Sequence, residues 1–116
     1  MQDPRKIFDT VSDNGAAAGI VIGGRPIGPL DIDLRWVGGI MYRNSEIEET
    51  GVAAGVLGHP ALGVAWLANK LGQHGAALEA GHLVLAGSFT RVVFARKRDT
   101  LHADFGNLGG IAIQFV

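Results

Sequence analysis

Glycine is the residue that most constrains how this chain can fold. It occupies 18 of the 116 positions, more than double the roughly 7% that is usual in proteins. Because glycine tolerates left-handed backbone conformations and weakens helices, such a chain favours tight turns and close backbone contacts over long helices. The sequence therefore predicts short strands joined by turns, with few helices.

Charge and length exclude several classes of protein. The chain carries 10 Lys+Arg and 11 Asp+Glu, and 47% of its residues are hydrophobic. We expect one domain over residues 1–116, with no nucleic-acid or membrane partner, because the charge is nearly balanced and no apolar run is long enough to span a bilayer. With no leader-like segment, we expect a cytoplasmic protein. The absence of cysteine excludes a disulfide scaffold and a thiolate zinc site.

Hydrophobic patterning indicates six or seven strands. The clearest alternation lies in 100–105, where Leu101, Ala103 and Phe105 alternate with polar residues, as in a half-buried strand. A polar turn at 43–46 separates two strand patterns and predicts a hairpin. The predicted strands are residues 16–22, 34–42, 47–56, 83–86, 91–95, 100–105 and 110–116.

One helix dominates the prediction. In 60–72, Pro60 suits a first helical position, and Val64, Leu67 and Leu71 recur on one face. A shorter helix is predicted at 4–14. No alternation of strands and helices is present, so a parallel doubly wound sheet is disfavoured. The fold class predicted is α+β, with a β-rich mixed sheet.

Most polar clusters favour a structural interpretation. The pair Asp31 and Asp33 could hold a hard cation, but acidic residues in a proline-rich loop are more often turn and cap residues. The acidic run 46–49 favours a solvated strand edge. The basic residues 96–98 favour a solvated turn. The four histidines have no spacing that would place two on one helix face, so they predict no metal site; they are His59, His74, His82 and His102.

Two segments leave a functional interpretation open. Residues 87–91 (GSFTR) follow an apolar strand with a glycine, two hydroxyls and a cation. A backbone free of side chains can approach a ligand, and hydroxyls with an arginine suit a carboxylate, although an ordinary bulge is the simpler alternative. Asp13 and Asn14 either close a helix or belong to a loop directed at a pocket.

Several runs together resemble a known family. In order and spacing they are similar to the 2-keto-4-pentenoate hydratase group of the fumarylacetoacetate hydrolase superfamily, and within it to the 2-oxohept-4-ene-1,7-dioate hydratases. The runs are 9–14 (DTVSDN), 22–26 (IGGRP), 33–35 (DLR), 58–60 with 65–71 (GHP, AWLANKL), 78–82 with 86–88 (LEAGH, AGS), and 99–106 with 108–109 (DTLHADFG, LG).

The resemblance implies a β-roll and a metal-dependent hydro-lyase. Family members are about twice as long, and this chain resembles only their C-terminal half. In the family a carboxylate cluster holds one Mg²⁺ or Mn²⁺, and a lysine and an acidic residue assist proton transfer. Those motifs lie upstream of the stretch matched here, so no metal ligand and no catalytic base is assigned to this chain.

The resemblance also implies a substrate-binding set. Asp13, Asn14 and Gly15 match a family loop near the pocket, and Ala16 and Ala17 depart from the serines of some relatives. Gly87 and Ser88 match a strand end that contacts substrate in the superfamily. The full predicted set is Asp13, Asn14, Gly15, Gly87, Ser88, Phe89, Thr90 and Arg91. We expect Arg91 to hold the distal carboxylate of a diacid, since a guanidinium matches a carboxylate bidentately.

Three functions follow as expectations. The first is hydration of a 2-oxo-4-enoate in aromatic-compound catabolism, by a chain incomplete for catalysis alone. The second is 4-oxalocrotonate decarboxylase, a related enzyme of the same family. The third is a non-catalytic truncated or split domain. If an upstream half normally covers this sheet, the exposed apolar surface favours association, and we expect a homo-oligomer.

Overall fold

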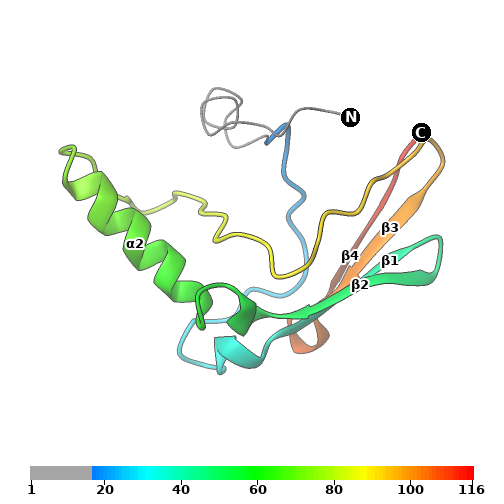
Figure 1. Ribbon diagram of the computed structural model, residues 1–116, viewed down its shortest axis with the longest axis horizontal. Helices are drawn as coiled ribbons and strands as arrows, with labels where there is room; N and C mark the ends of the chain where they lie inside the picture. Colours follow the sequence, from blue (N-terminus) through cyan, green and yellow to red (C-terminus); the bar gives the residue numbers. More distant parts are fainter. Residues whose placement is uncertain (1–16) are drawn as a thin grey trace.

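The computed structural model describes residues 17–116, which form an α+β arrangement of a small sheet and one helix set apart from it (Figure 1). The predicted helix at 4–14 and the site residues Asp13, Asn14 and Gly15 lie outside the described residues. In chain order the elements are the 3-10 helix η2 (Leu34–Trp36), the strands β1 (Gly38–Arg43) and β2 (Glu46–Val52), the 3-10 helix η3 (Ala53–Gly55), the helix α2 (Pro60–Gly72), the strand β3 (Thr100–Asp104), the 3-10 helix η4 (Gly106–Leu108) and the strand β4 (Gly110–Gln114).

The sheet has the order β2-β1-β3-β4, and each neighbouring pair is antiparallel. The hairpin between β1 and β2 turns at Asn44 and Ser45, whose φ angles are 52° and 71°. Two central residues with positive φ match the right-handed twist of the flanking strands. The hairpin predicted from the polar run 43–46 is therefore confirmed.

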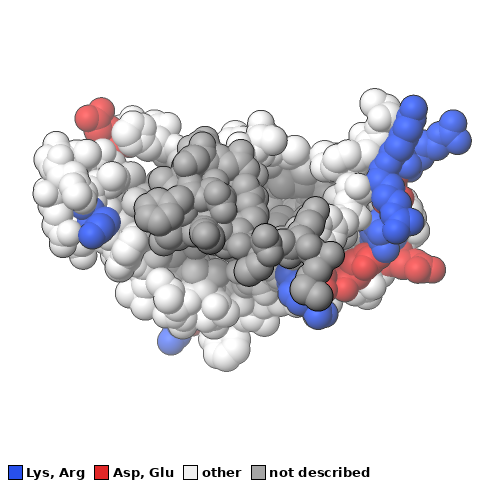
Figure 2. Space-filling model, turned by 45° about the horizontal axis from the view of Figure 1, so that its top comes forward, with Lys and Arg blue, Asp and Glu red and all other residues white. Residues whose placement is uncertain are grey.

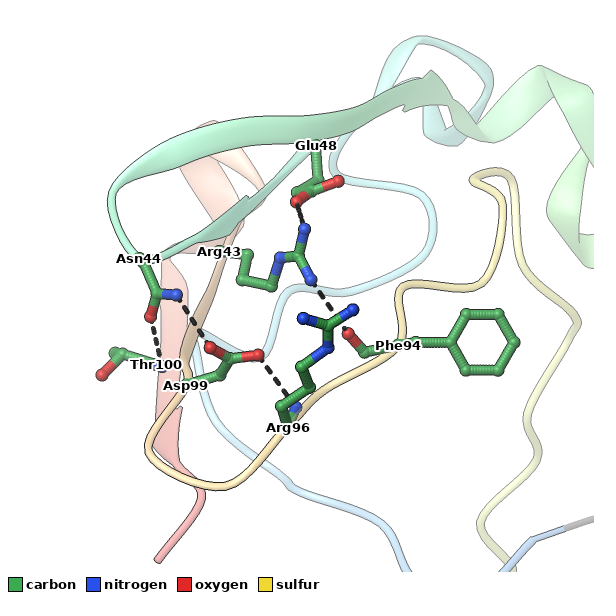
Figure 3. Close-up of polar contacts among 7 residues, drawn as sticks. All are labelled: Arg43, Asn44, Glu48, Phe94, Arg96, Asp99 and Thr100. Atoms are coloured by element: carbon green, nitrogen blue, oxygen red, sulfur yellow. Dashed lines mark hydrogen bonds and ion pairs between the residues drawn. The ribbon is translucent and has the colours of Figure 1, made fainter.

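A polar cluster joins the end of this hairpin to the turn that leads into β3 (Figure 3). The Asn44 amide donates to Asp99 Oδ1 at 2.8 Å, and its carbonyl oxygen accepts from the Thr100 backbone N–H at 2.9 Å. Asp99 Oδ2 accepts from the Arg96 backbone N–H at 2.8 Å. These hydrogen bonds hold the pKa of the Asp99 carboxyl below its usual value, and the one from Asn44 has the largest effect. The cluster fixes the register at this end of β1 and β3.

The predicted alternation in β3 is confirmed by its exposure. Leu101 and Ala103 are half-buried, whereas Thr100 and His102 are exposed. His102 stacks on its cross-strand partner Tyr42 with ring centroids 5.4 Å apart. Period-2 patterning thus identified the face of the strand that contacts the rest of the chain.

The predicted helix at 60–72 matches α2 at both ends. Pro60 lies in its first turn, and the His59 side chain accepts a hydrogen bond from the Ala61 backbone N–H at 3.1 Å. This contact satisfies one of the amide groups that a helix start leaves without a partner. Val64 and Leu67 on the predicted face are half-buried, as expected.

Three predicted strands are wrong in the described structure. Residues 17–22, 83–86 and 91–95 are in neither a strand nor a helix. Hydrophobic patterning predicts which side chains avoid water, but a strand also needs a neighbour to exchange backbone hydrogen bonds with it. The other four predictions are shortened: 34–42 begins with η2, 47–56 ends its pairing at Val52, 100–105 ends at Asp104, and 110–116 ends at Gln114.

The described part of the chain has a very small core. Among its hydrophobic residues only Ala53 is fully buried, with 4% of its surface exposed. The molecule measures 44 × 42 × 25 Å, and α2 extends away from the sheet (Figure 1). None of the described helices is long and apolar enough to cross a membrane.

Candidate functional site

The segment 87–91 closes over one face of the sheet beside a cavity of about 220 Å³. The cavity lies between this segment and the central strands β1 and β3. Its lining is Gly39, Ile40, Met41, Gly87, Ser88, Phe89, Thr90, Ala103 and Phe105. Four of the predicted substrate-binding residues, 87–90, therefore line one cavity.

Hydrogen bonds within the segment give it a defined shape. Gly87 has a φ of 103°, which a residue with a side chain rarely adopts. The Ser88 hydroxyl donates to the Thr90 carbonyl at 2.9 Å and accepts from the Thr90 backbone N–H at 3.2 Å. The two hydroxyls of Ser88 and Thr90 also lie 3.3 Å apart, so Ser88 holds the turn together.

Phe89 anchors the segment to the sheet through two glycines. Its ring meets Phe105 edge to face, with centroids 6.4 Å apart. A Cβ atom at Gly39 would lie 2.7 Å from the Phe89 ring, and a Cβ at Gly51 would overlap the Phe89 carbonyl oxygen. Only glycine lets backbone and ring approach so closely at these two strand positions.

Arg91 leaves the cavity and pairs with a carboxylate of β2. Its Nε lies 2.9 Å from Glu49 Oε1, and its side chain is 87% exposed while that of Glu49 is 17% exposed. The structure thus already supplies a carboxylate partner for the residue predicted to bind one. The closest contact is made by Nε, and most of the Arg91 side chain stays exposed.

A second, more open cavity of about 740 Å³ lies between η2, the sheet and η4. Asp33 and Asp104 contribute its two carboxylates. Arg35 donates to both Asp33 oxygens, at 2.9 and 2.6 Å, and this interaction lowers the pKa of Asp33 to about 2. Asp104 accepts from the Gly106 backbone N–H at 2.8 Å. Each carboxylate therefore has a structural partner.

Metal ligands are not gathered anywhere in residues 17–116. No group of three or more histidine and acidic side chains in that range could hold a metal ion. The helix-capping role of Asp33 before η2 confirms the turn interpretation of the 31–33 loop. His59 caps α2, and His82 accepts from the Glu79 backbone N–H at 3.1 Å. The described residues therefore do not fit a divalent cation.

Sequence reasoning missed Glu49 and the two glycines that receive Phe89. Glu49 belongs to an acidic run interpreted as a solvated edge, and β2 is indeed an edge strand. Its side chain is only 17% exposed and pairs with Arg91, which lies 42 positions away and gives no local signal. The glycines did give a signal, because a glycine inside a strand pattern marks close backbone approach.

Comparisons with known proteins find similarity to hydratases and to a decarboxylase. No family model matches the chain. It is 64% identical over 115 residues to 2-oxo-hept-4-ene-1,7-dioate hydratase of Escherichia coli, and 36% identical over 110 residues to 4-oxalocrotonate decarboxylase of Pseudomonas putida. These matches cover 99% and 95% of the chain, but only 43% and 42% of the relatives.

Solved structures give the same result. The 4-oxalocrotonate decarboxylase of Pseudomonas putida G7, complexed with magnesium and adipate, is 34% identical and matches 93% of the chain with a TM-score of 0.89. That match covers 41% of the solved chain. The chain is thus similar to 2-oxo-hept-4-ene-1,7-dioate and 2-keto-4-pentenoate hydratases, and it spans less than half the length of the relatives it matches.

Proposed function

We propose that this chain is part of a hydratase that adds water to a 2-oxo-4-enoate, with 2-oxohept-4-ene-1,7-dioate as the substrate. The observation that carries the proposal is the difference in identity, which is 64% to the hydratase of Escherichia coli and 36% to the decarboxylase of Pseudomonas putida. A seven-carbon diacid also suits a binding segment that ends in an arginine.

The reaction determines which groups the site must supply. A 2-hydroxy-2,4-dienoate, the enol tautomer of the 2-oxo-4-enoate, is protonated at C5 to give the conjugated 2-oxo-3-enoate, and water then adds at C4, with a proton going to C3, to give a 4-hydroxy-2-oxo acid. A divalent cation would stabilise the developing enolate, with Mg²⁺ or Mn²⁺ as the proposed ion. Because residues 17–116 hold no ligand set, we assign the cation and the acid–base groups to polypeptide outside them. These residues alone are not expected to catalyse the reaction.

The described residues would bind and orient the substrate. Gly87 and Ser88 would present backbone and hydroxyl to the reacting end of the molecule. Arg91 would offer its terminal amino groups to the distal carboxylate while Glu49 holds Nε. A charge-assisted, bidentate contact of this kind gives both affinity and orientation.

A chimera tests the function. This chain would replace the matching 115 residues of the Escherichia coli hydratase, and hydration would be followed as loss of the ultraviolet absorbance of the conjugated 2-hydroxydienoate tautomer of the substrate. We expect water addition to the seven-carbon diacid, dependent on Mg²⁺. Release of CO₂ from 4-oxalocrotonate without hydration would instead establish the decarboxylase, the second candidate, which the structural match at a TM-score of 0.89 favours.

Arg91→Ala in the same chimera tests the role of the arginine. We expect kcat/KM for the diacid to fall at least tenfold, while that for a 2-oxo-4-enoate with no distal carboxylate stays within twofold. Equal losses for both substrates would assign Arg91 to the structure of the segment, and no loss for either would remove it from the site.

A further inference from the structure

Two segments that flank the candidate site expose apolar side chains in an alternating pattern. In residues 83–86, Leu83 and Leu85 are 59% and 68% exposed, while Val84 and Ala86 are half-buried. In 92–95, Val92 and Phe94 are 76% and 80% exposed, and their neighbours Val93 and Ala95 are again half-buried. Both segments are thus apolar on both sides, a pattern typical of strands covered on two faces.

The backbone of these segments has few partners among the described residues; the Arg43 side chain donates to the Phe94 carbonyl oxygen at 3.4 Å (Figure 3). No backbone–backbone hydrogen bond joins any of residues 83–95 to another position in 17–116. Burying these side chains would remove the backbone groups from water as well, and such groups must then be paired. A covering partner must therefore supply both apolar side chains and backbone donors and acceptors. A polypeptide that adds strands does so, whereas a lipid surface does not.

The amount of exposed surface indicates a large partner. The chain exposes 9319 Å², against about 6000 Å² for a compact protein of this mass. Its radius of gyration is 15.9 Å, against about 13 Å for a compact chain of this length. The excess area is several times the roughly 800 Å² that each partner contributes to a standard interface. An excess of this size is closer to the area exposed when one hydrophobic core is divided between two polypeptides.

A charged turn follows one of the two segments. Figure 2 shows Lys and Arg gathered, with Asp and Glu beside them, at the end of the molecule away from α2. The exposed cations of the turn 96–98 lie immediately after Ala95. The apolar segment thus stops where the solvated basic turn begins.

We propose that the segments 83–86 and 92–95, together with the exposed apolar residues 20–22, form a docking surface for a polypeptide equivalent to the part of the hydratase relatives that this chain does not match. More than half of each relative lies outside the matched region. A second copy of this chain would bring the same unpaired segments and no cation ligands from its described residues. The choice of partner rests on the proposed function, whereas the surface itself rests on exposure and hydrogen bonding.

Co-expression tests the proposal. The unmatched part of the Escherichia coli hydratase would be produced as a separate tagged polypeptide together with this chain. We expect the two to purify as a one-to-one complex. We also expect amide hydrogen exchange in 83–86 and 92–95 to slow at least tenfold relative to this chain alone.

Substitutions on the proposed surface are compared with a control substitution away from it. Phe94→Asp and Leu85→Asp are expected to weaken the association at least tenfold. The control is Leu30→Asp, which changes a side chain that is 97% exposed in a turn, and it should bind as the unmodified chain does. Because exchange is measured on unmodified chains, the test does not depend on the folding of any variant.

Each outcome decides the proposal. It is overturned if the two polypeptides do not associate, or if they associate while both segments exchange as fast as in the free chain. It is also overturned if this chain alone forms a dimer in which the segments are protected. Association and protection without hydration would retain the docking surface and refute the proposed function.

Discussion

Replacing Gly51 by alanine should displace the candidate binding segment from the sheet. The added Cβ would overlap the carbonyl oxygen of Phe89 and would lie 2.8 Å from its ring atom Cδ2. The carbonyl is part of the backbone, so the strain is relieved only if the segment moves or β2 bends. Overpacking of this kind costs about 1–3 kcal/mol.

The matched control is Gly38→Ala in the adjacent strand. There the nearest atom to an added Cβ is the Gly51 carbonyl oxygen at 3.8 Å, an ordinary contact. With a urea m-value of about 1–3 kcal/mol per M, Gly51→Ala should lower the unfolding midpoint by about 1 M, and Gly38→Ala should leave it nearly unchanged. The ring resonances of Phe105 should also shift in the first variant, because the edge-to-face contact with Phe89 opens.

Gly39 gives an internal test of the same reasoning. Its added Cβ would meet the Phe89 ring at 2.7 Å instead of the backbone. Phe89→Ala should therefore rescue Gly39→Ala but should not rescue Gly51→Ala, and the two double variants would differ in their coupling energies. Equal unfolding midpoints for Gly51→Ala and Gly38→Ala, or rescue of both variants by Phe89→Ala, would refute the account of how the segment is held.

Three further predictions concern the frame around the site. Arg35→Gln should raise the pKa of Asp33 from about 2 toward 3.8 in an NMR titration; the pair stabilises the fold above pH 3.8 and loses its effect as the pH falls toward 2, so this variant should lose that acid dependence. His59→Ala should lower the free energy of unfolding by about 1 kcal/mol, measured by thermal denaturation, because the first turn of α2 loses its cap. Asn44→Ala should raise the pKa of Asp99, followed by NMR, because the hydrogen bond that lowers this pKa most is lost.

Local chemistry made the helix and the hairpin predictable. Pro60 and the apolar periodicity defined α2, and the polar run with Asn44 defined the turn between β1 and β2. Both depend on interactions within a few residues, which a sequence shows directly. The period-2 pattern of β3 was readable for the same reason.

Pairing was not predictable, because it depends on what lies beside a strand. Residues 83–86 and 100–104 carry comparably clear apolar patterns, yet only the second pairs in the described structure. The pattern reports a preference for burial, while a neighbouring strand decides whether the backbone can be satisfied there. The same limit applies to Arg91, since its partner Glu49 was visible in the sequence but their contact was not.

The placement of the candidate site links the proposed function to the docking surface. Phe89 faces inward and is held by the glycines of β1 and β2, so this chain alone sets the position of the segment. Ser88 and Arg91 are exposed, and the unpaired residues 83–86 and 92–95 lie on either side of them. Strands added to those two segments would border the exposed face of the site. The polypeptide that completes the sheet would therefore also determine which atoms face the substrate, and cation ligands carried by that polypeptide would reach the site by the same docking.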